Sequence, residues 1–312
     1  MKVCRGRAQR PIRNRLERRH GLQQDDYEEP FGWWGWHWQP PQPLSVVQLL
    51  EARSFDAATL GLIWALMARR ASVIVGAEPP MAGKTTTLTA LLDFLPPDTR
   101  RLYLHGNYET FEFANDPATE PQECYLLANE MSDHLAIYFW GARIGRLFSL
   151  LPQGYAFGST MHAANVEEVL DILCAPPLNV PPRLLPGLNL VINLVLLTQG
   201  GRYRRRCAAV HLVLPGDGSQ GVSTYCLARW DAEADQLVHA WTEPATLDAL
   251  AQWTGTPAAL LTAELAQRAD YLRGLQQGEQ TAIPTVRRRL AAFAQASSTA
   301  TPEAEHKSDI IS

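Results

Sequence analysis

The stretch of residues 72–88 restricts the possible fold of this chain more than any other. It opens with a β-branched run at 73–75, which is typical of a buried strand. Small residues and prolines follow, then Gly83, Lys84 and Thr85, and then leucines at helical spacing. A buried strand, a loop, Gly-Lys-Thr and a helix, in that order, form the context in which a phosphate-binding loop occurs.

The chemistry of such a loop predicts a nucleotide site. Backbone N–H groups of the loop and the helix N-terminus surround an anion. Lys84 would reach the β- and γ-phosphates of ATP, and the Thr85 hydroxyl would be a ligand of Mg²⁺. The sequence therefore predicts ATP and Mg²⁺ as cofactors. The residues expected to bind them are Pro79, Pro80, Met81, Ala82, Gly83, Lys84, Thr85 and Thr86.

One position departs from the usual spacing of this motif. The pattern G-x-x-x-x-G-K-[ST] has its first glycine where this chain has Glu78. Glycine lets the backbone turn tightly toward the phosphate, whereas a carboxylate adds a negative charge near a polyanion. We therefore expect Glu78 to weaken nucleotide binding. The alternative interpretation of the stretch is a helix N-terminus that contains Gly-Lys-Thr by accident.

Composition limits the class of protein. A length of 312 residues predicts about two domains, and a hydrophobic content of 46% is enough for a packed core. The net charge of −4 gives no case for a nucleic-acid partner. The five cysteines are widely spaced and form no CxxC pair, which indicates neither a zinc ribbon nor a disulfide framework and favours a reducing compartment. No apolar run approaches the roughly 20 residues of a membrane span.

Changes in composition divide the chain into parts. Residues 1–43 are predicted to be a flexible tail, basic at first and then rich in Trp and Pro, and residues 44–239 carry strand and helix patterns. Residues 240–293 have helical periodicity alone and predict a small all-helical domain, and residues 294–312 predict a disordered tail. A dense group of tryptophans is expected to dock on the body of the protein or on a partner. Its members are Trp33, Trp34, Trp36 and Trp38.

The pattern of residues 44–239 is α/β. Strands are expected at 73–75, 101–104, 124–128, 155–161, 190–197 and 207–214, and helices at two places within 44–70, at 136–151 and at 166–173. Ser54 or Asp56 is the expected cap of the second helix, and Asn165 is the expected cap of the last. Residues 200–206, two glycines followed by a basic run, predict an exposed hairpin with a solvated basic tip.

Polar residues that follow these strands are candidates for catalysis. Glu130 ends the apolar run that begins at Cys124, which is typical of a Walker B strand; it would orient the attacking water and contact Mg²⁺ through water. Glu109 and His162 follow two other strands. Because ligands of open α/β sheets bind at the carboxyl ends of strands, we expect both to support the γ-phosphate or to couple its loss to movement. The alternative for His162 is a hydrogen-bonded core histidine.

Beyond these residues, the sequence resembles the secretion-superfamily ATPases, which power type II and type IV secretion, type IV and tight-adherence pili, and the archaeal flagellum. Residues 159–163, Ser-Thr-Met-His-Ala, resemble the His box of that family. Residues 176–181, Pro-Pro-Leu-Asn-Val-Pro, resemble a turn of its archaeal and tight-adherence branch. The predicted hairpin and the segment 264–275 match as well, so the resemblance extends over residues 44–293.

The resemblance implies a RecA-like P-loop ATPase domain followed by a small all-helical domain. It implies an ATP-binding and hydrolysing motor subunit of a type II/type IV secretion or pilus-type system. The working unit would be a homohexamer with the nucleotide between subunits and with arginines supplied by a neighbouring subunit. The implied partner is an inner-membrane platform protein, and the implied location is the cytoplasm, at the inner face of the membrane.

Departures from the family pattern motivate an alternative. Glu78 replaces a glycine, Asn107 stands where an acidic pair is usual, and Asn129 replaces the glycine before Glu130. The 43 residues that precede residue 44 are too few for the family's N-terminal domain, which closes over the nucleotide. The alternative is a catalytically degenerate paralogue that acts as a regulatory or interaction subunit. A second alternative, an unrelated P-loop protein that acts on nucleic acid, fits the acidic composition and the His-box match less well.

Overall fold

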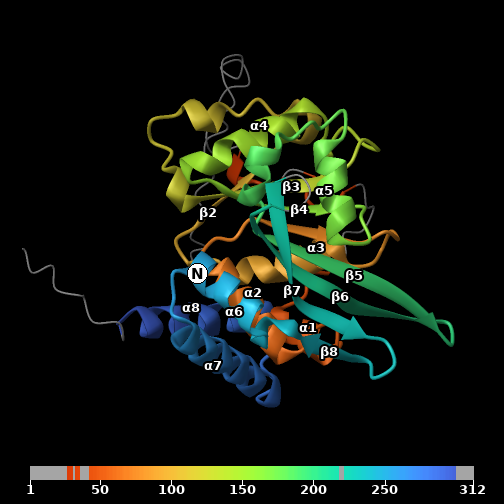
Figure 1. The fold of residues 1–312 in the computed structure, drawn as a ribbon, viewed down its shortest axis with the longest axis vertical. Coiled ribbons are helices and arrows are strands. Elements are labelled where there is room, and N and C mark those ends of the chain that lie inside the picture. The colour runs from red at the N-terminus through yellow and green to blue at the C-terminus, as the bar shows by residue number, and fades with distance from the viewer. Residues whose placement is uncertain (1–26, 31, 36–41, 218–220, 300–312) are drawn as a thin grey trace, which may run out of the picture.

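The computed structural model describes residues 27–30, 32–35, 42–217 and 221–299. An 8-stranded sheet runs through it in the order β2-β3-β4-β1-β5-β6-β7-β8 (Figure 1). The strands are β1 Val73–Gly76, β2 Arg100–Tyr103, β3 Cys124–Met131, β4 Ala156–Met161, β5 Leu190–Gln199, β6 Arg202–Pro215, β7 Val222–Asp231 and β8 Gln236–His239. The helices are α1 Val46–Glu51, α2 Ala57–Met67, α3 Lys84–Leu91, α4 Ala142–Leu150, α5 Val166–Cys174, α6 Pro244–Thr254, α7 Ala258–Gln277 and α8 Ile283–Thr299.

The two halves of the sheet differ in strand direction. The strands β1 to β5 pair in parallel, whereas β5, β6, β7 and β8 pair antiparallel. β4 separates β1, which precedes the P-loop, from β3, which carries Glu130. This topology confirms the expected α/β, RecA-like fold class. It also brings the carboxyl ends of β1, β3 and β4 to one edge of the sheet, where ligands of such sheets bind.

Strand β1 shows why helices cover both faces of the sheet. Val73 and Val75 share an apolar cluster with residues of α1, α2 and α7, whereas Ile74 belongs to a second cluster with residues of α4 and α5. Successive side chains of a strand point to opposite faces, so a strand that is apolar at every position needs cover on both sides. The result is a three-layer arrangement of helices, sheet and helices (Figure 1).

Two of the helices begin at the expected side-chain caps. The Asp56 carboxylate accepts a hydrogen bond from the Thr59 N–H at 2.7 Å and caps α2. Asn165 Oδ1 accepts from the Glu168 N–H at 2.8 Å and caps α5. Each cap satisfies a backbone donor that has no partner within its helix. For α2, the structure decides between the two candidate caps in favour of Asp56 over Ser54.

The C-terminal helices extend the core on the side of α2. Leu265 of α7 lies in the same apolar cluster as Leu60 of α2. A Cβ atom at Gly61 would lie 2.9 Å from the backbone nitrogen of Ala269, so the close approach of α2 and α7 requires glycine there. Residues 240–293 are helical, as the pattern predicts, and they share the core of the α/β part.

The structure corrects two expected helix boundaries. The helix expected at 136–151 begins only at Ala142, because Gly141 has φ 75° and ψ −150°, a conformation that interrupts a helix. α8 continues to Thr299, so the first residues of the expected disordered tail, 294–299, are helical. Residues 300–312 lie outside the described part of the chain.

The structure confirms the expected exposed hairpin and corrects the extent of its solvated basic tip, because Arg202 and Arg204 are exposed whereas Arg206 is not. β5 and β6 are joined at Gly200 and Gly201, whose φ angles of 57° and 74° suit a two-residue hairpin turn. The arginines of residues 202–206 therefore lie within β6, and Arg206 is buried and pairs with Asp235 at 2.7 Å. Hydrogen bonding to Arg206 lowers the pKa of Asp235 to about 2. β7 and β8, which continue the sheet beyond this hairpin, have no counterpart among the expected strands.

Part of the tryptophan-rich segment packs on the body of the protein. Trp33 is 4% exposed, its Nε1–H donates to Thr89 Oγ1 at 2.9 Å, and its ring meets the Tyr103 ring edge-on at 5.5 Å. Tyr27 is also buried. These contacts agree with the expected docking and correct the assignment of a flexible tail for the described residues of the segment. Trp36, Trp38 and the basic residues 1–26 lie outside the described part.

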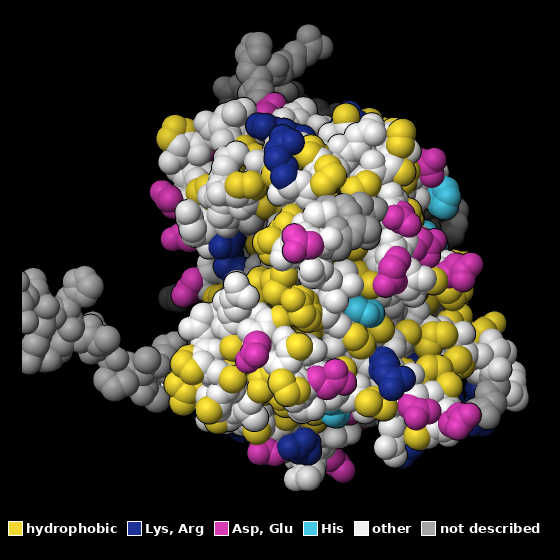
Figure 2. Space-filling view, in the orientation of Figure 1, with side chains coloured by type: hydrophobic (Ala, Val, Ile, Leu, Met, Phe, Trp, Pro, Cys, Tyr) yellow, Lys and Arg dark blue, Asp and Glu magenta, His cyan; other side chains and the backbone are white. Residues whose placement is uncertain are grey.

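Charged side chains of both signs are mixed on the face shown in Figure 2. Lys and Arg occur in separate groups among Asp and Glu, and no continuous basic patch covers this face. Among the residues that the structure describes, no helix combines the length and the apolar character needed to cross a bilayer.

Replacing Trp33 tests the docking of the N-terminal segment. Trp33→Ala removes a buried aromatic side chain and leaves a cavity, so it should destabilise the protein by about 3–5 kcal/mol. Urea unfolding, monitored by circular dichroism, measures this loss as a lower urea concentration at the midpoint. Trp34→Ala, at the half-buried neighbour, is the matched control and should cost less. An unchanged midpoint for Trp33→Ala would show that the segment does not dock.

Candidate functional site

The loop between β1 and α3 borders a pocket of about 940 Å³. α3 begins at Lys84, and the residue before it, Gly83, has φ 92° and ψ 18°, a left-handed conformation that suits glycine. The N-terminus of a helix carries backbone N–H groups without internal partners, so the pocket borders an anion-binding element. Of the expected cofactor-binding residues, Pro79 does not line the pocket. Those that do are Pro80, Met81, Ala82, Gly83, Lys84, Thr85 and Thr86.

Lys84 brings a buried positive charge to this pocket. The residue is 6% exposed, and burial lowers the pKa of its ammonium group, an effect that the charge of Glu130 opposes. A cation that has lost part of its hydration gains from an anion placed beside it. The residues present therefore fit the polyphosphate of ATP, and Thr85, the next residue of α3, offers a hydroxyl of the kind that binds Mg²⁺ beside a phosphate.

Glu78 does not make the turn that glycine makes in the usual motif. Its φ is not positive, its side chain is exposed, and its carbonyl oxygen lies 3.0 Å from Nδ1 of His162. The left-handed residues of the loop are instead Met81, with φ 62°, and Gly83. The Glu78 side chain is not among those that line the pocket. The weakening of nucleotide binding by Glu78 therefore stays a prediction.

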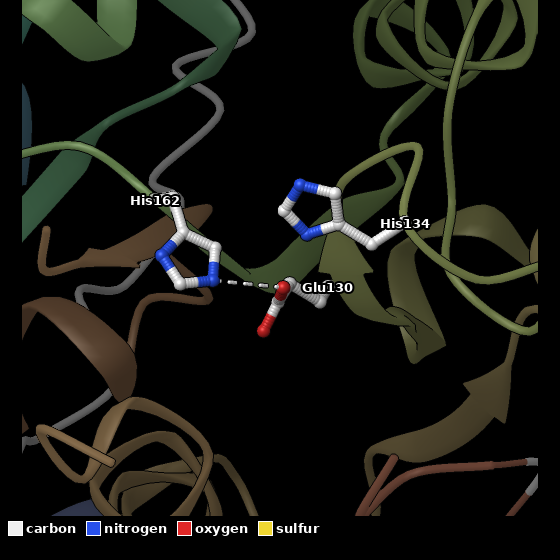
Figure 3. Close-up of side chains that lie close together, drawn as sticks. All are labelled: Glu130, His134 and His162. Atoms are coloured by element: carbon white, nitrogen blue, oxygen red, sulfur yellow. Dashed lines mark ion pairs between the residues drawn. The ribbon is translucent and has the colours of Figure 1, made fainter. Parts of the chain in front are cut away.

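Glu130 and His162 meet at the carboxyl ends of β3 and β4 (Figure 3). The pairing of these strands shifts register between Leu127 and Glu130, and an irregularity of this kind changes the direction of a side chain. Glu130 Oε1 lies 3.2 Å from His162 Nε2, and Lys84 Nζ lies 3.4 Å from both ring nitrogens of His162. The structure thus brings together Lys84, Glu130 and His162, which the sequence identifies only one by one.

His134 belongs to the same cluster, although the sequence analysis does not identify it. One ligand atom each of Glu130, His134 and His162 lie within 4.8 Å of one another (Figure 3). His134 lies in an irregular segment after β3. In such a segment, the spacing of two residues in the sequence does not predict whether their side chains lie close together. The one sequence feature that could have identified His134 as a site residue is its position shortly after the carboxylate expected to end a Walker B strand.

Glu109 does not join this cluster, so its contacts in the structure give no support to its expected role at the γ-phosphate. The residue is 5% exposed, and its carboxylate accepts hydrogen bonds from the Tyr27 hydroxyl and the His105 N–H, both at 2.8 Å, and from the Phe111 N–H. Burial and the charge of Glu109 raise the pKa of Tyr27. Glu109 is not among the residues that line the pocket. It holds a loop and the N-terminal segment in place.

Arg205 of β6 is a second residue that the sequence analysis does not place at the site. Its Nε and Nη2 atoms donate to the carbonyl oxygen of Met81, at 3.1 and 3.0 Å. Its Cδ would lie 3.0 Å from a Cβ atom at Gly83, so a side chain there would collide with it. Arg205, expected to lie in a solvated tip, therefore makes a direct contact between the hairpin and the P-loop.

The N-terminal segment supplies part of the pocket wall. Trp34 lines the pocket together with Leu49 and Tyr138. The amide of Asn129 donates to the carbonyl oxygen of Gly32, next to the buried Trp33. Asn129, the residue before Glu130, thus holds the segment that covers this side of the pocket.

The fold and the pocket define the class of protein: a RecA-like α/β domain with a P-loop at the carboxyl edge of its parallel strands. No protein-family model matches the chain. The uncharacterized protein MJ1287 of Methanocaldococcus jannaschii is 27% identical over 245 residues, which are 73% of this chain and 90% of that protein. The uncharacterized protein MJ0900 of the same organism is 24% identical over 224 residues, which are 63% of this chain and 38% of that protein.

Among solved structures, the chain is similar to two secretion ATPases. The VirB11 ATPase from the Brucella suis type IV secretion system gives a TM-score of 0.39 at 15% identity, over 54% of this chain and 55% of that chain. The Legionella pneumophila ATPase DotB gives a TM-score of 0.35 at 12% identity, over 54% of this chain and 53% of that chain. The aligned part is about half the length of each of these two chains.

A substitution at Glu109 tests its structural role. Glu109→Gln weakens hydrogen bonds to a buried charged acceptor and should lower the free energy of unfolding by about 1–3 kcal/mol. Its affinity for ATP, measured by calorimetry, should stay at the wild-type value. Tyr27→Phe removes the donor of one of these hydrogen bonds, so it should also lower stability and leave ATP affinity unchanged. Lost ATP affinity with unchanged stability would instead return Glu109 to the γ-phosphate.

A substitution at Arg205 tests the contact between the hairpin and the P-loop. Arg205→Ala removes a positive charge and the cap on the Met81 carbonyl, so ATP affinity should fall by about two- to tenfold, or about 0.5–1.5 kcal/mol. Calorimetric titration with ATP gives the value. Arg202→Ala, at an exposed position of the same strand, changes the net charge equally and should have no such effect. Equal losses in both variants would mean that only the overall charge matters.

Proposed function

We propose that this chain is an ATP-binding and hydrolysing motor subunit of a type II/type IV secretion or pilus-type system. The observation that carries the proposal is the convergence of Lys84, Glu130 and His162 on one pocket, at the P-loop and at the carboxyl ends of β3 and β4. The His-box and turn motifs at residues 159–163 and 176–181 support the choice of secretion-type ATPases among P-loop proteins.

In this proposal each residue has a distinct role. The N–H groups at the start of α3 and the Lys84 ammonium hold the phosphates, and Thr85 holds Mg²⁺. The Mg²⁺ ion would neutralise charge that develops on the phosphate oxygens. Glu130, next to the phosphate-binding lysine, orients and polarises the attacking water. His162 contacts both Glu130 and the Glu78 carbonyl of the P-loop, so it links the state of the phosphate to the position of the loop.

The proposed motor works as an assembly. The resemblance to secretion-superfamily ATPases supports a homohexamer, with arginines supplied between subunits, a membrane platform protein as partner, and a position in the cytoplasm at the inner face of the membrane. A hexamer would complete the cover of the pocket, of which Trp34 supplies one wall. Exclusion of water strengthens the electrostatic contacts inside such a pocket. ATP turnover per chain should therefore rise with assembly.

The second candidate is a catalytically degenerate paralogue that acts as a regulatory or interaction subunit. Glu78 in the P-loop motif favours it, and so does the position of Glu109, whose carboxylate is taken up by structural hydrogen bonds. Asn107, where the family has an acidic pair, donates its backbone N–H to the Ala136 carbonyl at 3.0 Å. This candidate predicts nucleotide binding with little or no turnover.

Two matched variants test the proposed function. Lys84→Ala removes a charge-assisted contact worth about 1.5–3 kcal/mol, so ATP affinity should fall about ten- to a hundredfold. Glu130→Gln should keep ATP affinity and lose turnover, because a group that orients water stabilises the transition state more than the bound nucleotide. Calorimetry measures the affinity, and phosphate release against protein concentration measures the turnover.

The outcomes separate the two candidates. Wild-type ATP affinity in Lys84→Ala would rule out the P-loop assignment. Tight ATP binding without turnover in the wild type, even when light scattering reports a hexamer, would favour the degenerate paralogue. Full turnover in Glu130→Gln would assign Glu130 a structural role.

A further inference from the structure

We infer that Glu130, His134 and His162 form a binding site for a divalent transition-metal ion of the Zn²⁺ type. This site is chemically distinct from that of the Mg²⁺ ion that accompanies ATP, and it goes beyond the proposed function. It does not require that the chain bind nucleotide. The three ligand atoms lie within 4.8 Å of one another at the carboxyl ends of β3 and β4 (Figure 3).

The hydrogen bonds of His162 provide the first argument. The Glu78 carbonyl, 3.0 Å from Nδ1, only accepts hydrogen bonds, so Nδ1 carries the ring proton. In the neutral ring, Nε2 then presents a lone pair to Glu130 Oε1 at 3.2 Å. Two acceptors that face each other at this distance are held together by a cation, which is either a proton on Nε2 or a metal ion. Histidine ligands of metals are oriented in the same way, by donating their other N–H to a backbone carbonyl.

The position of His134 provides the second argument. Its side chain is 69% exposed, so it can rotate toward Glu130 and His162 without disturbing the core. Tetrahedral coordination at metal–ligand distances of 2.0–2.2 Å places ligand atoms about 3.4 Å apart, and the separations here are at most 4.8 Å. The ligand atoms therefore need to approach one another by at most about 1.4 Å to reach tetrahedral separations. The Asp133 carboxylate, 3.8 Å from His134 Nε2, adds a second negative charge nearby.

Lys84 is the charged group that opposes a metal at this place. Its Nζ is equally far, 3.4 Å, from both ring nitrogens of His162. An atom equidistant from both nitrogens lies beside the ring and off the direction of the Nε2 lone pair. The ammonium therefore leaves that lone pair accessible, and the charges of Glu130 and Asp133 together exceed that of Lys84.

The ligand types select the class of metal. Two imidazole nitrogens and one carboxylate oxygen suit Zn²⁺, Co²⁺ or Ni²⁺, whereas Mg²⁺ prefers oxygen ligands alone. Three protein ligands leave a fourth position for water or an anion. All three residues line the same pocket as the P-loop, so this open position faces the place where a phosphate would bind.

The experiment uses the untagged full-length protein without nucleotide. Co²⁺ is titrated and followed by visible absorption, and Zn²⁺ affinity is then measured by competition. Wild-type protein should bind one ion per chain with the absorption of a tetrahedral nitrogen and oxygen site. His134→Ala should keep its fold by circular dichroism and lose about a hundredfold or more in affinity, since loss of a direct ligand costs at least as much as loss of a supporting contact.

Two control variants make the result specific. His239→Ala removes a different imidazole, on the edge strand β8, and should leave Zn²⁺ affinity unchanged. Lys84→Ala removes the opposing cation, so Zn²⁺ affinity should be equal or higher while ATP affinity falls. If the wild-type protein binds Zn²⁺ but does not bind ATP, the proposed function is contradicted and the metal site is supported.

The proposal is overturned by equal Zn²⁺ affinity in the wild type and in His134→Ala. Equal losses in His134→Ala and His239→Ala would also overturn it, because they would indicate scattered surface binding. Absence of saturable binding in the wild type would overturn it as well. It would leave His162 and Glu130 as an ion pair that shares a proton, in which His134 has no part.

Discussion

The contact of His162 with the P-loop on one side and with Glu130 on the other is the interaction on which the whole pocket depends. One ring nitrogen meets the Glu78 carbonyl at 3.0 Å and the other meets the Glu130 carboxylate at 3.2 Å. This is possible only because β4, which ends just before His162, lies between β1 and β3 in the sheet. A displacement of the P-loop is therefore transmitted through His162 to the end of β3, and a displacement of the end of β3 is transmitted to the P-loop.

The cover of the pocket comes from parts of the chain that are distant in sequence. Trp34 forms one wall, held by the bond from Asn129 to Gly32, and Arg205 reaches the P-loop from the hairpin of β5 and β6. Each of these contacts joins the walls of the pocket to an element that the usual motif does not include. Glu78 and Asn129, where the sequence differs from the pattern of the ATPases it resembles, thus take part in specific contacts of this structure.

The sequence predicts the central part of the site because its signals are local. Lys84 follows from the order of strand, loop and helix, and Glu130 and His162 follow from their places at the ends of apolar strands. Glu109 satisfies the same rule and yet lies elsewhere, because the hydroxyl of Tyr27 and two backbone N–H groups bind its carboxylate. A rule based on strand ends predicts that a residue lies at the edge of the sheet. It does not predict which hydrogen-bond donors bind the side chain there.

The sequence by itself determined the α/β class, the order of strand, loop and helix around Lys84, and the helical character of residues 240–293; it also predicts Lys84 as the phosphate ligand. Periodicity and glycine placement depend on neighbours within a few residues, so they are visible in the chain. Only the tertiary structure decided that Arg205 contacts the P-loop, that Glu109 leaves the pocket, and that His134 joins Glu130 and His162. These contacts depend on how β6, the N-terminal segment and an irregular loop pack against the sheet, and no local pattern encodes distances between such elements.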